Sequence, residues 1–249
     1  MKNLALFKPV FFLLIGVVVT LSSCEPYDFG SQKEDSYEKV IPNSNDLVFE
    51  PTSRPFAQSY AEWIDEWVKA VPANACDNIE YNEAFATLDK SNRVYFLAGA
   101  TGIVADRNIS LLPEKAILFP LLNKVTTYPC DYNSGRKPVG TQTVEEFLKQ
   151  ESTIYMNKTT LLEVTIDNLP YRLANSHRFS TGAFKIFNNR TMENCFNICS
   201  AVDQVQDALM DGYWIMLKGL EAGDHTIKIN AEIPQVGLKN SVTYNIIVR

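Results

Sequence analysis

The last third of the chain alternates apolar and polar residues with a period of two. One apolar series lies in residues 225–231 and comprises His225, Ile227, Ile229 and Ala231. Residues 242–248 repeat the pattern, and residues 162–166 show it earlier in the chain. Because successive side chains of a strand point to opposite faces, each stretch predicts a strand with one buried face. Turn-forming residues come next, at Asp167-Asn168-Leu169-Pro170, so a strand from Tyr171 is expected to pair back.

Continuous apolar runs predict strands that are buried on both faces. Residues 94–99 form one such run, and residues 116–119 form a second, which Pro120 is expected to end. Shorter apolar runs predict two more strands, at residues 183–187 and 213–217. Residues 203–210 are mixed in character and ambiguous.

Two stretches have the periodicity of amphipathic helices. In residues 57–70 and just beyond, the apolar stripe comprises Tyr60, Trp63, Ile64, Trp67 and Val71. Pro72 is expected to end this helix. Residues 143–155 predict a second helix, which begins with a capping box of Thr143 and Glu146. Its predicted stripe comprises Val144, Phe147, Leu148 and Ile154.

These elements predict a mainly β fold with two helices. Several short strands separated by turns are typical of an antiparallel β-sandwich-like single domain, which we place at residues 51–249. We expect Trp63 and Trp67 to pack against the strand at residues 94–99. The alternative for these two tryptophans is an exposed aromatic platform for a ligand.

The first residues have the pattern of a bacterial lipoprotein signal. A charged start, an apolar stretch and Leu21-Ser22-Ser23 precede Cys24. Residues 1–23 are therefore predicted to be a signal peptide, and Cys24 is predicted to be lipidated. An uncleaved membrane anchor is the alternative, but it needs about 20 apolar residues and the run here is shorter. Residues 24–50 are polar and acidic without periodicity, which predicts a flexible tether.

The predicted location is the outer membrane, with the membrane as a partner through the lipid on Cys24. The acidic residues after Cys24 resemble the surface-export signal of Bacteroidetes lipoproteins, so display at the cell surface is expected. A protein that faces the periplasm is the alternative. The formal net charge is −6, which excludes nucleic acid as a partner because such binding depends on phosphate neutralisation by basic residues.

Four further cysteines predict disulfides in an oxidising compartment, namely Cys76, Cys130, Cys195 and Cys199. Their number leaves three connectivities open, although the closely spaced last pair would close a small loop and leave the other two together. A zinc site is the alternative. The two histidines, His177 and His225, lie far from either pair in the sequence, so no metal is expected.

Several stretches resemble a family of secreted bacterial proteins of uncharacterised function. They are SYAEW at residues 59–63 with Trp67, VYFLAG at 94–99, Arg107, PEKAILFP at 113–120 with Asn123, LEVTID at 162–167, DGYWIML at 211–217 and GDHTI at 223–227. They occur in the family's order. The chain departs from the family at Glu114, where glycine is usual, and it lacks the cysteines that members carry before the VYFLAG strand and after Arg107. The resemblance implies no activity.

The sequence contains no recognisable catalytic motif. It has no G-x-S-x-G nucleophile elbow, no H-E-x-x-H zinc helix and no phosphate-binding glycine loop. No catalytic residue or cofactor is therefore assigned, and whether the protein is an enzyme stays open. His177 and His225 each have the chemistry of a general base, but His225 begins an apolar series and is expected to be a hydrogen-bonded core histidine.

The candidate ligand site consists of polar and aromatic residues in the family-like stretches, namely Glu62, Trp63, Arg107 and Asn123. One interpretation is that Glu62 and Arg107 form an ion pair that pins the first helix to the sandwich. The other is a polar pocket beside Trp63 and Trp67 that suits a sugar. We expect a lipid-anchored binding or interaction module for an extracellular glycan or protein. The alternative is a glycan-acting hydrolase, which needs two carboxylates about 5–10 Å apart.

Overall fold

The computed structural model describes residues 44–75, 86–88, 91–98, 104–129, 136–188 and 204–249. Ile41–Arg249 form one compact unit, to which the description below refers. Its first element is a short 3-10 helix, η1 (Ser44–Leu47), after which Val48 forms a β-bridge with Leu217. Residues 44–50, predicted to belong to the tether, therefore pack with the domain. The predicted signal peptide and Cys24 lie outside the described residues.

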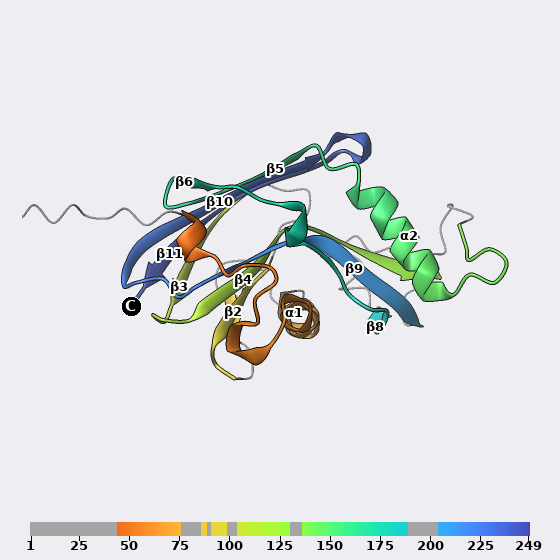
Figure 1. The fold of residues 1–249 in the computed structure, drawn as a ribbon, viewed down its shortest axis with the longest axis horizontal. Coiled ribbons are helices and arrows are strands. Elements are labelled where there is room, and N and C mark those ends of the chain that lie inside the picture. The colour runs from red at the N-terminus through yellow and green to blue at the C-terminus, as the bar shows by residue number, and fades with distance from the viewer. Residues whose placement is uncertain (1–43, 76–85, 89–90, 99–103, 130–135, 189–203) are drawn as a thin grey trace, which may run out of the picture. The chain divides into compact units, whose positions relative to one another are not determined.

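Two β-sheets make up most of the unit (Figure 1). The strands of the six-stranded sheet are β1 (Ala86–Leu88), β2 (Val94–Leu97), β4 (Ala116–Tyr128), β9 (Gln204–Leu217), β7 (Arg178–Ser180) and β8 (Phe184–Asn188). The strands of the five-stranded sheet, in spatial order, are β3 (Val104–Leu111), β11 (Leu238–Val248), β10 (Gly223–Ile233), β5 (Leu161–Ile166) and β6 (Leu169–Tyr171).

This architecture confirms the predicted mainly β, sandwich-like fold with two helices. The sheets are mixed, however, because β2 pairs with β4 and β3 pairs with β11 in parallel. An antiparallel sandwich was predicted from several short strands with turns between them. Alternation along a strand reports which face is buried and carries no information about the direction of the neighbouring strand.

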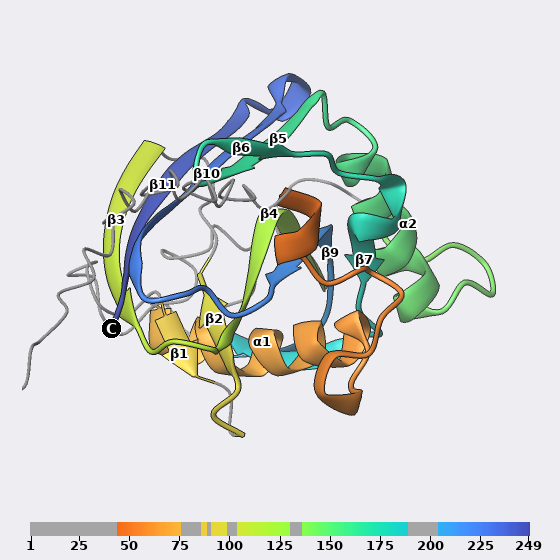
Figure 2. The ribbon, with the colours of Figure 1, turned by 60° about the vertical axis from the view of Figure 1, so that its left-hand side comes forward.

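The main core lies between the two sheets (Figure 2). Ile117, Phe119 and Ile215 of the six-stranded sheet belong to it together with Ile227 and Tyr244 of the five-stranded sheet. Helix α1 (Tyr60–Ala75) covers the other face of the six-stranded sheet and forms a second apolar cluster there. The strand β2 is therefore buried on both faces, as its apolar run predicted.

Neither of the two prolines expected to end an element does so. Helix α1 continues through Pro72 to Ala75. A proline inside a helix removes one hydrogen bond and crowds the carbonyl four residues earlier, which can kink a helix without ending it. Strand β4 continues past Pro120 because its register against β9 shifts between Pro120 and Leu122. Proline is tolerated at such a β-bulge, where pairing is already interrupted.

The bulge in β4 also changes which side chains face which layer. Before it, Phe119 contacts the main core between the sheets. After it, Leu122 packs with Met156 of helix α2 (Val144–Met156) and with Ala231 of β10. Near the centre of β4, this side of the six-stranded sheet faces the five-stranded sheet. Farther along β4 and β9, the same side is covered by α2.

Helix α2 begins as predicted, with Thr143 and Glu146 forming a reciprocal capping box. Its buried side chains are Phe147, Leu148, Ser152 and Met156. Ile154, predicted to belong to the stripe, is instead 37% exposed. With 3.6 residues per turn, Leu148, Ser152 and Met156 follow one another at four-residue steps and define the buried face. Ile154 lies two turns after Phe147, at the edge of this face and roughly 120° or more from the other three.

The hairpin of β5 and β6 is formed by the predicted turn. Asp167 and Asn168 have φ angles of 50° and 64°, the left-handed conformation that a two-residue hairpin requires and that these residue types tolerate. In contrast, the sequence left residues 203–210 ambiguous, and residues 204–210 form the first half of β9. The end of this segment is covered on both faces, Leu209 by α2 and Met210 in the α1 cluster, while Gln204 and Val205 at its start are exposed, so one-sided alternation is absent.

None of the helices in the described parts of the chain has the length and apolar character needed to cross a membrane.

Candidate functional site

The tryptophans of α1 are core residues. Trp63 is 0% exposed and Trp67 is 2% exposed. The Trp63 ring meets Phe96 edge to face, and Trp67 Nε1 donates a hydrogen bond to Leu97 O at 2.9 Å. The predicted packing against this strand is confirmed, and the alternative of an exposed aromatic platform is wrong, because the rings offer no accessible face.

Glu62 and Arg107 do not form the ion pair considered from the sequence. Glu62 lies at the exposed start of α1, where its carboxylate accepts from Ser59 N at 2.6 Å and from Arg54 Nη2 at 3.2 Å. The bond from the Ser59 amide is the main reason that the pKa of Glu62 is lowered. Glu62 is therefore a helix cap and does not face a pocket.

Arg107 lies on β3, in the other sheet, and is 4% exposed. Its Nη1 donates to Ala98 O at 2.6 Å and to the Tyr244 hydroxyl at 3.0 Å. The Tyr244 hydroxyl in turn donates to Ala98 O. Among the described strands β3 lies at the edge of its sheet, where an inward-pointing charge disfavours pairing with the strands of other molecules.

The other residues of the predicted polar pocket are also separate. Asn123 on β4 is half-buried, and its Nδ2 lies 3.5 Å from Met210 Sδ. Lys115, just before β4, donates from Nζ to Asn92 O at 2.6 Å. Glu62, Trp63, Arg107 and Asn123 thus do not form one site. Cys76, Cys130, Cys195 and Cys199 lie outside the described residues, so their pairing stays a prediction.

Among the described residues, no group of three or more histidine, cysteine, aspartate or glutamate side chains is placed to hold a metal ion. His177 is 3% exposed, and its Nε2 lies 2.9 Å from the Tyr171 hydroxyl. Burial lowers the pKa of His177. The surroundings of His177 are therefore those of a buried structural residue, and its ring is not accessible as a base.

His225 joins the β5–β6 turn to the start of β10. Its Nδ1 donates to Asp167 Oδ2 at 2.7 Å, and its Nε2 donates to Glu221 O at 3.0 Å. Asp167 Oδ1 also accepts from Thr226 N at 2.8 Å. Both ring nitrogens thus face acceptors, which only the doubly protonated imidazolium satisfies. With both nitrogens occupied, His225 has no free nitrogen to act as a general base.

The stabilisation from His225 is expected to depend on pH. Burial lowers the pKa of His225, but the bonds to Asp167 and Glu221 and the charges of Asp167 and Asp224 outweigh it and raise the pKa above 6.5. A raised folded-state pKa adds stability that is complete below 6.5 and lost as the pH rises through the raised value. Chemical denaturation of wild type and His225→Gln should therefore give a larger stability difference at about pH 5.5 than at about pH 9. Equal differences at both pH values would contradict this assignment.

A cavity of about 420 Å³ lies over the β5 side of the five-stranded sheet. We call it the β5 groove; its polar and apolar walls include Glu163, Thr165, Pro170, Arg172, Lys228 and Asn230. Strand pairing aligns Lys228 with Thr165 and Pro170, and Asn230 with Glu163. Along β5 and β10 these side chains alternate with core residues such as Val164 and Ile229. The groove therefore lies on the outer face of the sandwich.

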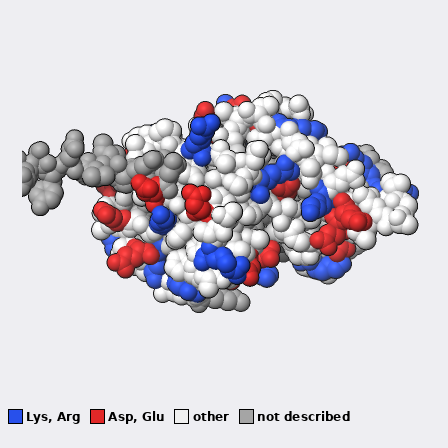
Figure 3. All heavy atoms as spheres, viewed as in Figure 1, with Lys and Arg blue, Asp and Glu red and all other residues white. Residues whose placement is uncertain are grey.

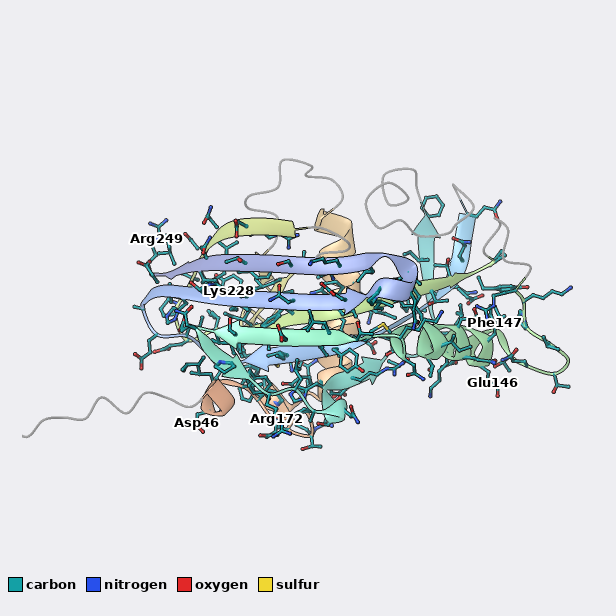
Figure 4. The ribbon with its side chains drawn as sticks, turned by 90° about the horizontal axis from the view of Figure 1, so that it is seen from above. Asp46, Glu146, Phe147, Arg172, Lys228 and Arg249 are labelled. Atoms are coloured by element: carbon teal, nitrogen blue, oxygen red, sulfur yellow. The ribbon has the colours of Figure 1, made fainter. Side chains whose placement is uncertain are left out.

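The charged groups of the β5 groove are unpaired. Glu163, Arg172 and Lys228 are exposed, and none has a hydrogen-bond or ion-pair partner in the part of the chain that the structure describes. Lys228 lies on β10 and Arg172 follows β6, so strand β5 runs between them (Figure 4). Acidic and basic side chains are otherwise interspersed over the face shown in Figure 3.

The groove was missed from the sequence, although one signal for it was present. Alternation in residues 225–231 places Lys228 and Asn230 on the solvent face. Arg172 had no such signal, because it follows a strand of only three residues. The juxtaposition of β10 with β5 and β6 requires the tertiary structure.

Comparison with known proteins identifies no family. No protein-family model matches the chain, and no curated protein sequence matches it. A cysteine protease inhibitor from Entamoeba histolytica is a solved structure with limited similarity, at 12% sequence identity and a TM-score of 0.22. The match covers 63% of this chain and 96% of that chain. Similarity at this level carries no argument about function.

Proposed function

We propose that the protein is a lipid-anchored cell-envelope protein whose domain binds an extracellular ligand in the β5 groove. Residues 1–23 and Cys24 carry the sequence pattern for export and lipidation. The acidic segment that follows supports display at the surface of the outer membrane, with a periplasm-facing protein as the alternative. In this arrangement the lipid holds the domain at the membrane, and the domain holds the ligand.

The observation that carries the proposal is the set of unpaired charged side chains around the β5 groove. Binding sites typically combine a concave surface with a few convergent polar groups. Glu163, Arg172 and Lys228 supply such groups on the outer face of the sheet, while the inner face is occupied by the core. A ligand would supply the partners that these charges lack within the described fold.

The hydrolase alternative has no specific observation in its favour. A glycosidase needs two carboxyl groups on either side of the scissile bond. The residues that line the β5 groove include a single carboxylate, that of Glu163. We therefore propose a binding role for this site.

Blocking the groove tests the binding role. Thr165 lies on the outer face of β5, where a tryptophan side chain would fill the groove and still suit a strand. We expect the full-length protein, purified from membranes in mild detergent, to retain members of a panel of neutral and acidic polysaccharides. Thr165→Trp should abolish retention, whereas Ser110→Trp, at an exposed position of β3 that β11 separates from β10, should preserve it. No retention by wild type, or full retention by Thr165→Trp, would contradict the proposed function.

Lipidation at Cys24 is a separate prediction. Mass spectrometry of the mature wild-type protein should find a modified N-terminal Cys24, because the apolar stretch and Leu21-Ser22-Ser23 precede it. Cys24→Ala should yield unlipidated protein. An unmodified Cys24, or cleavage well downstream of it, would refute the anchor and leave the groove to be tested by itself.

A further inference from the structure

We propose that the β5 groove selects an acidic saccharide, with Lys228 and Arg172 contacting ligand carboxylates and Glu163 accepting hydrogen bonds from ligand hydroxyls. This inference rests on the proposed function and names its ligand class. It depends on the balance of charges, on the backbone pairing beneath the groove and on the apolar part of its wall.

The charge balance of the β5 groove favours an anion. Two cations that have no partner among the described residues, Lys228 and Arg172, accompany one carboxylate, Glu163, in a chain whose net charge is −6. A site with a local excess of positive charge attracts anionic ligands, even on a protein whose net charge is negative. Strands are about 4.8 Å apart, so two spacings separate β10 from β6 and the cations stand on opposite sides of β5. An elongated ligand with repeated carboxylates can contact both.

The backbone beneath the groove favours a saccharide over an acidic peptide. An extended peptide typically gains affinity by pairing its main chain with a free strand edge. β5 is hydrogen-bonded to β10 on one side and to β6 on the other, so a peptide lying between the two cations finds no free edge to pair with. The outer edge of β6, which has no partner among the described strands, is only three residues long. A sugar needs only side-chain partners, and Glu163 and the Asn230 amide can accept from and donate to its hydroxyls.

The wall of the groove also has an apolar part. Pro170 is exposed, and Leu162 and Leu173 are half-buried. These side chains can contact the C–H face of a sugar ring, while the polar groups contact its edge. The combination of an apolar wall with a few directional polar groups is typical of small-ligand sites.

The test compares trigalacturonic acid with its methyl ester, which has the same sugar ring and no carboxylate charge. Isothermal titration calorimetry of the full-length protein in mild detergent should show affinity for the acid at least about tenfold higher than for the ester. Arg172→Ala and Lys228→Ala should each weaken binding of the acid about tenfold or more. Lys149→Ala removes an exposed charge on α2, outside the groove, and should leave affinity unchanged.

Each other outcome overturns the inference in a recognisable way. Equal affinity for acid and ester, with binding still blocked by Thr165→Trp, would refute acidic selection and leave the proposed function standing. Tighter binding of hexaglutamate than of trigalacturonic acid would assign the groove to acidic peptides instead. No binding of either saccharide would refute the ligand class, and retention of other polysaccharides would then decide the proposed function separately.

Discussion

Replacing Trp67 by alanine is expected to lower the free energy of unfolding by about 3–5 kcal/mol, the range for aromatic truncation in a core. The side chain is 2% exposed and meets Trp214 edge to face at 5.0 Å between ring centroids. It also donates the hydrogen bond to Leu97 O, which the variant would leave without this partner. For a domain of this size, the loss corresponds to a decrease of roughly 6–20 °C in melting temperature, measurable by calorimetry.

Trp63→Ala should have a similar effect, since Trp63 is fully buried and its Nε1 donates to Pro55 O at 3.0 Å. Val139→Ala is the control, because Val139 is 76% exposed and its truncation removes little buried area. If both tryptophan variants melted within about 2 °C of wild type, the structural role of the α1 stripe would be refuted.

Replacing Asp211 by alanine is expected to lower the free energy of unfolding by about 2–4 kcal/mol, somewhat below the full cost of breaking a buried ion pair. Arg178 Nε and Nη2 donate to the two Asp211 oxygens at 3.0 and 2.6 Å. The Asp211 side chain is 3% exposed. Alanine at this position would leave the Arg178 guanidinium next to the core without its carboxylate partner. The Arg178 side chain is 22% exposed, which allows partial rehydration and reduces the cost.

The same strand provides a matched control for Asp211. Asp207 on β9 pairs with Lys185 at 2.6 Å, but the two side chains are 30% and 66% exposed. Asp207→Ala should therefore cost less than about 1 kcal/mol in urea denaturation. Comparable losses for Asp207→Ala and Asp211→Ala would show that burial does not govern these pairs. In a double-mutant cycle, Arg178→Ala combined with Asp211→Ala should cost less than the sum of the single changes.

The candidate ligand residues show why sequence reasoning placed single residues well and their partners poorly. The helical stripe identified Trp63 as buried because neighbours along one helix define its apolar face. Glu62 and Arg107 were both recognised as unusual polar residues, but each is satisfied elsewhere: Glu62 within its own helix start and Arg107 by Ala98 and Tyr244. A partner in another sheet leaves no periodic trace in the sequence.

The sequence by itself determined the elements that depend on near neighbours. The alternation at residues 242–248 made Tyr244 a core residue, Asp167 and Asn168 made the hairpin turn, and Thr143 began α2. Each of these rests on forces within a few residues, namely a shared face, a tolerated left-handed backbone or a local cap.

Only the tertiary structure decided which strands lie side by side. It made β3 parallel to β11, buried β9 on both faces and continued β4 through a bulge at Pro120. It also placed Lys228 and Arg172 on either side of β5. These outcomes depend on contacts between segments distant in the chain, because a strand's partners are selected by the packing of whole faces and not by the pattern of the strand alone.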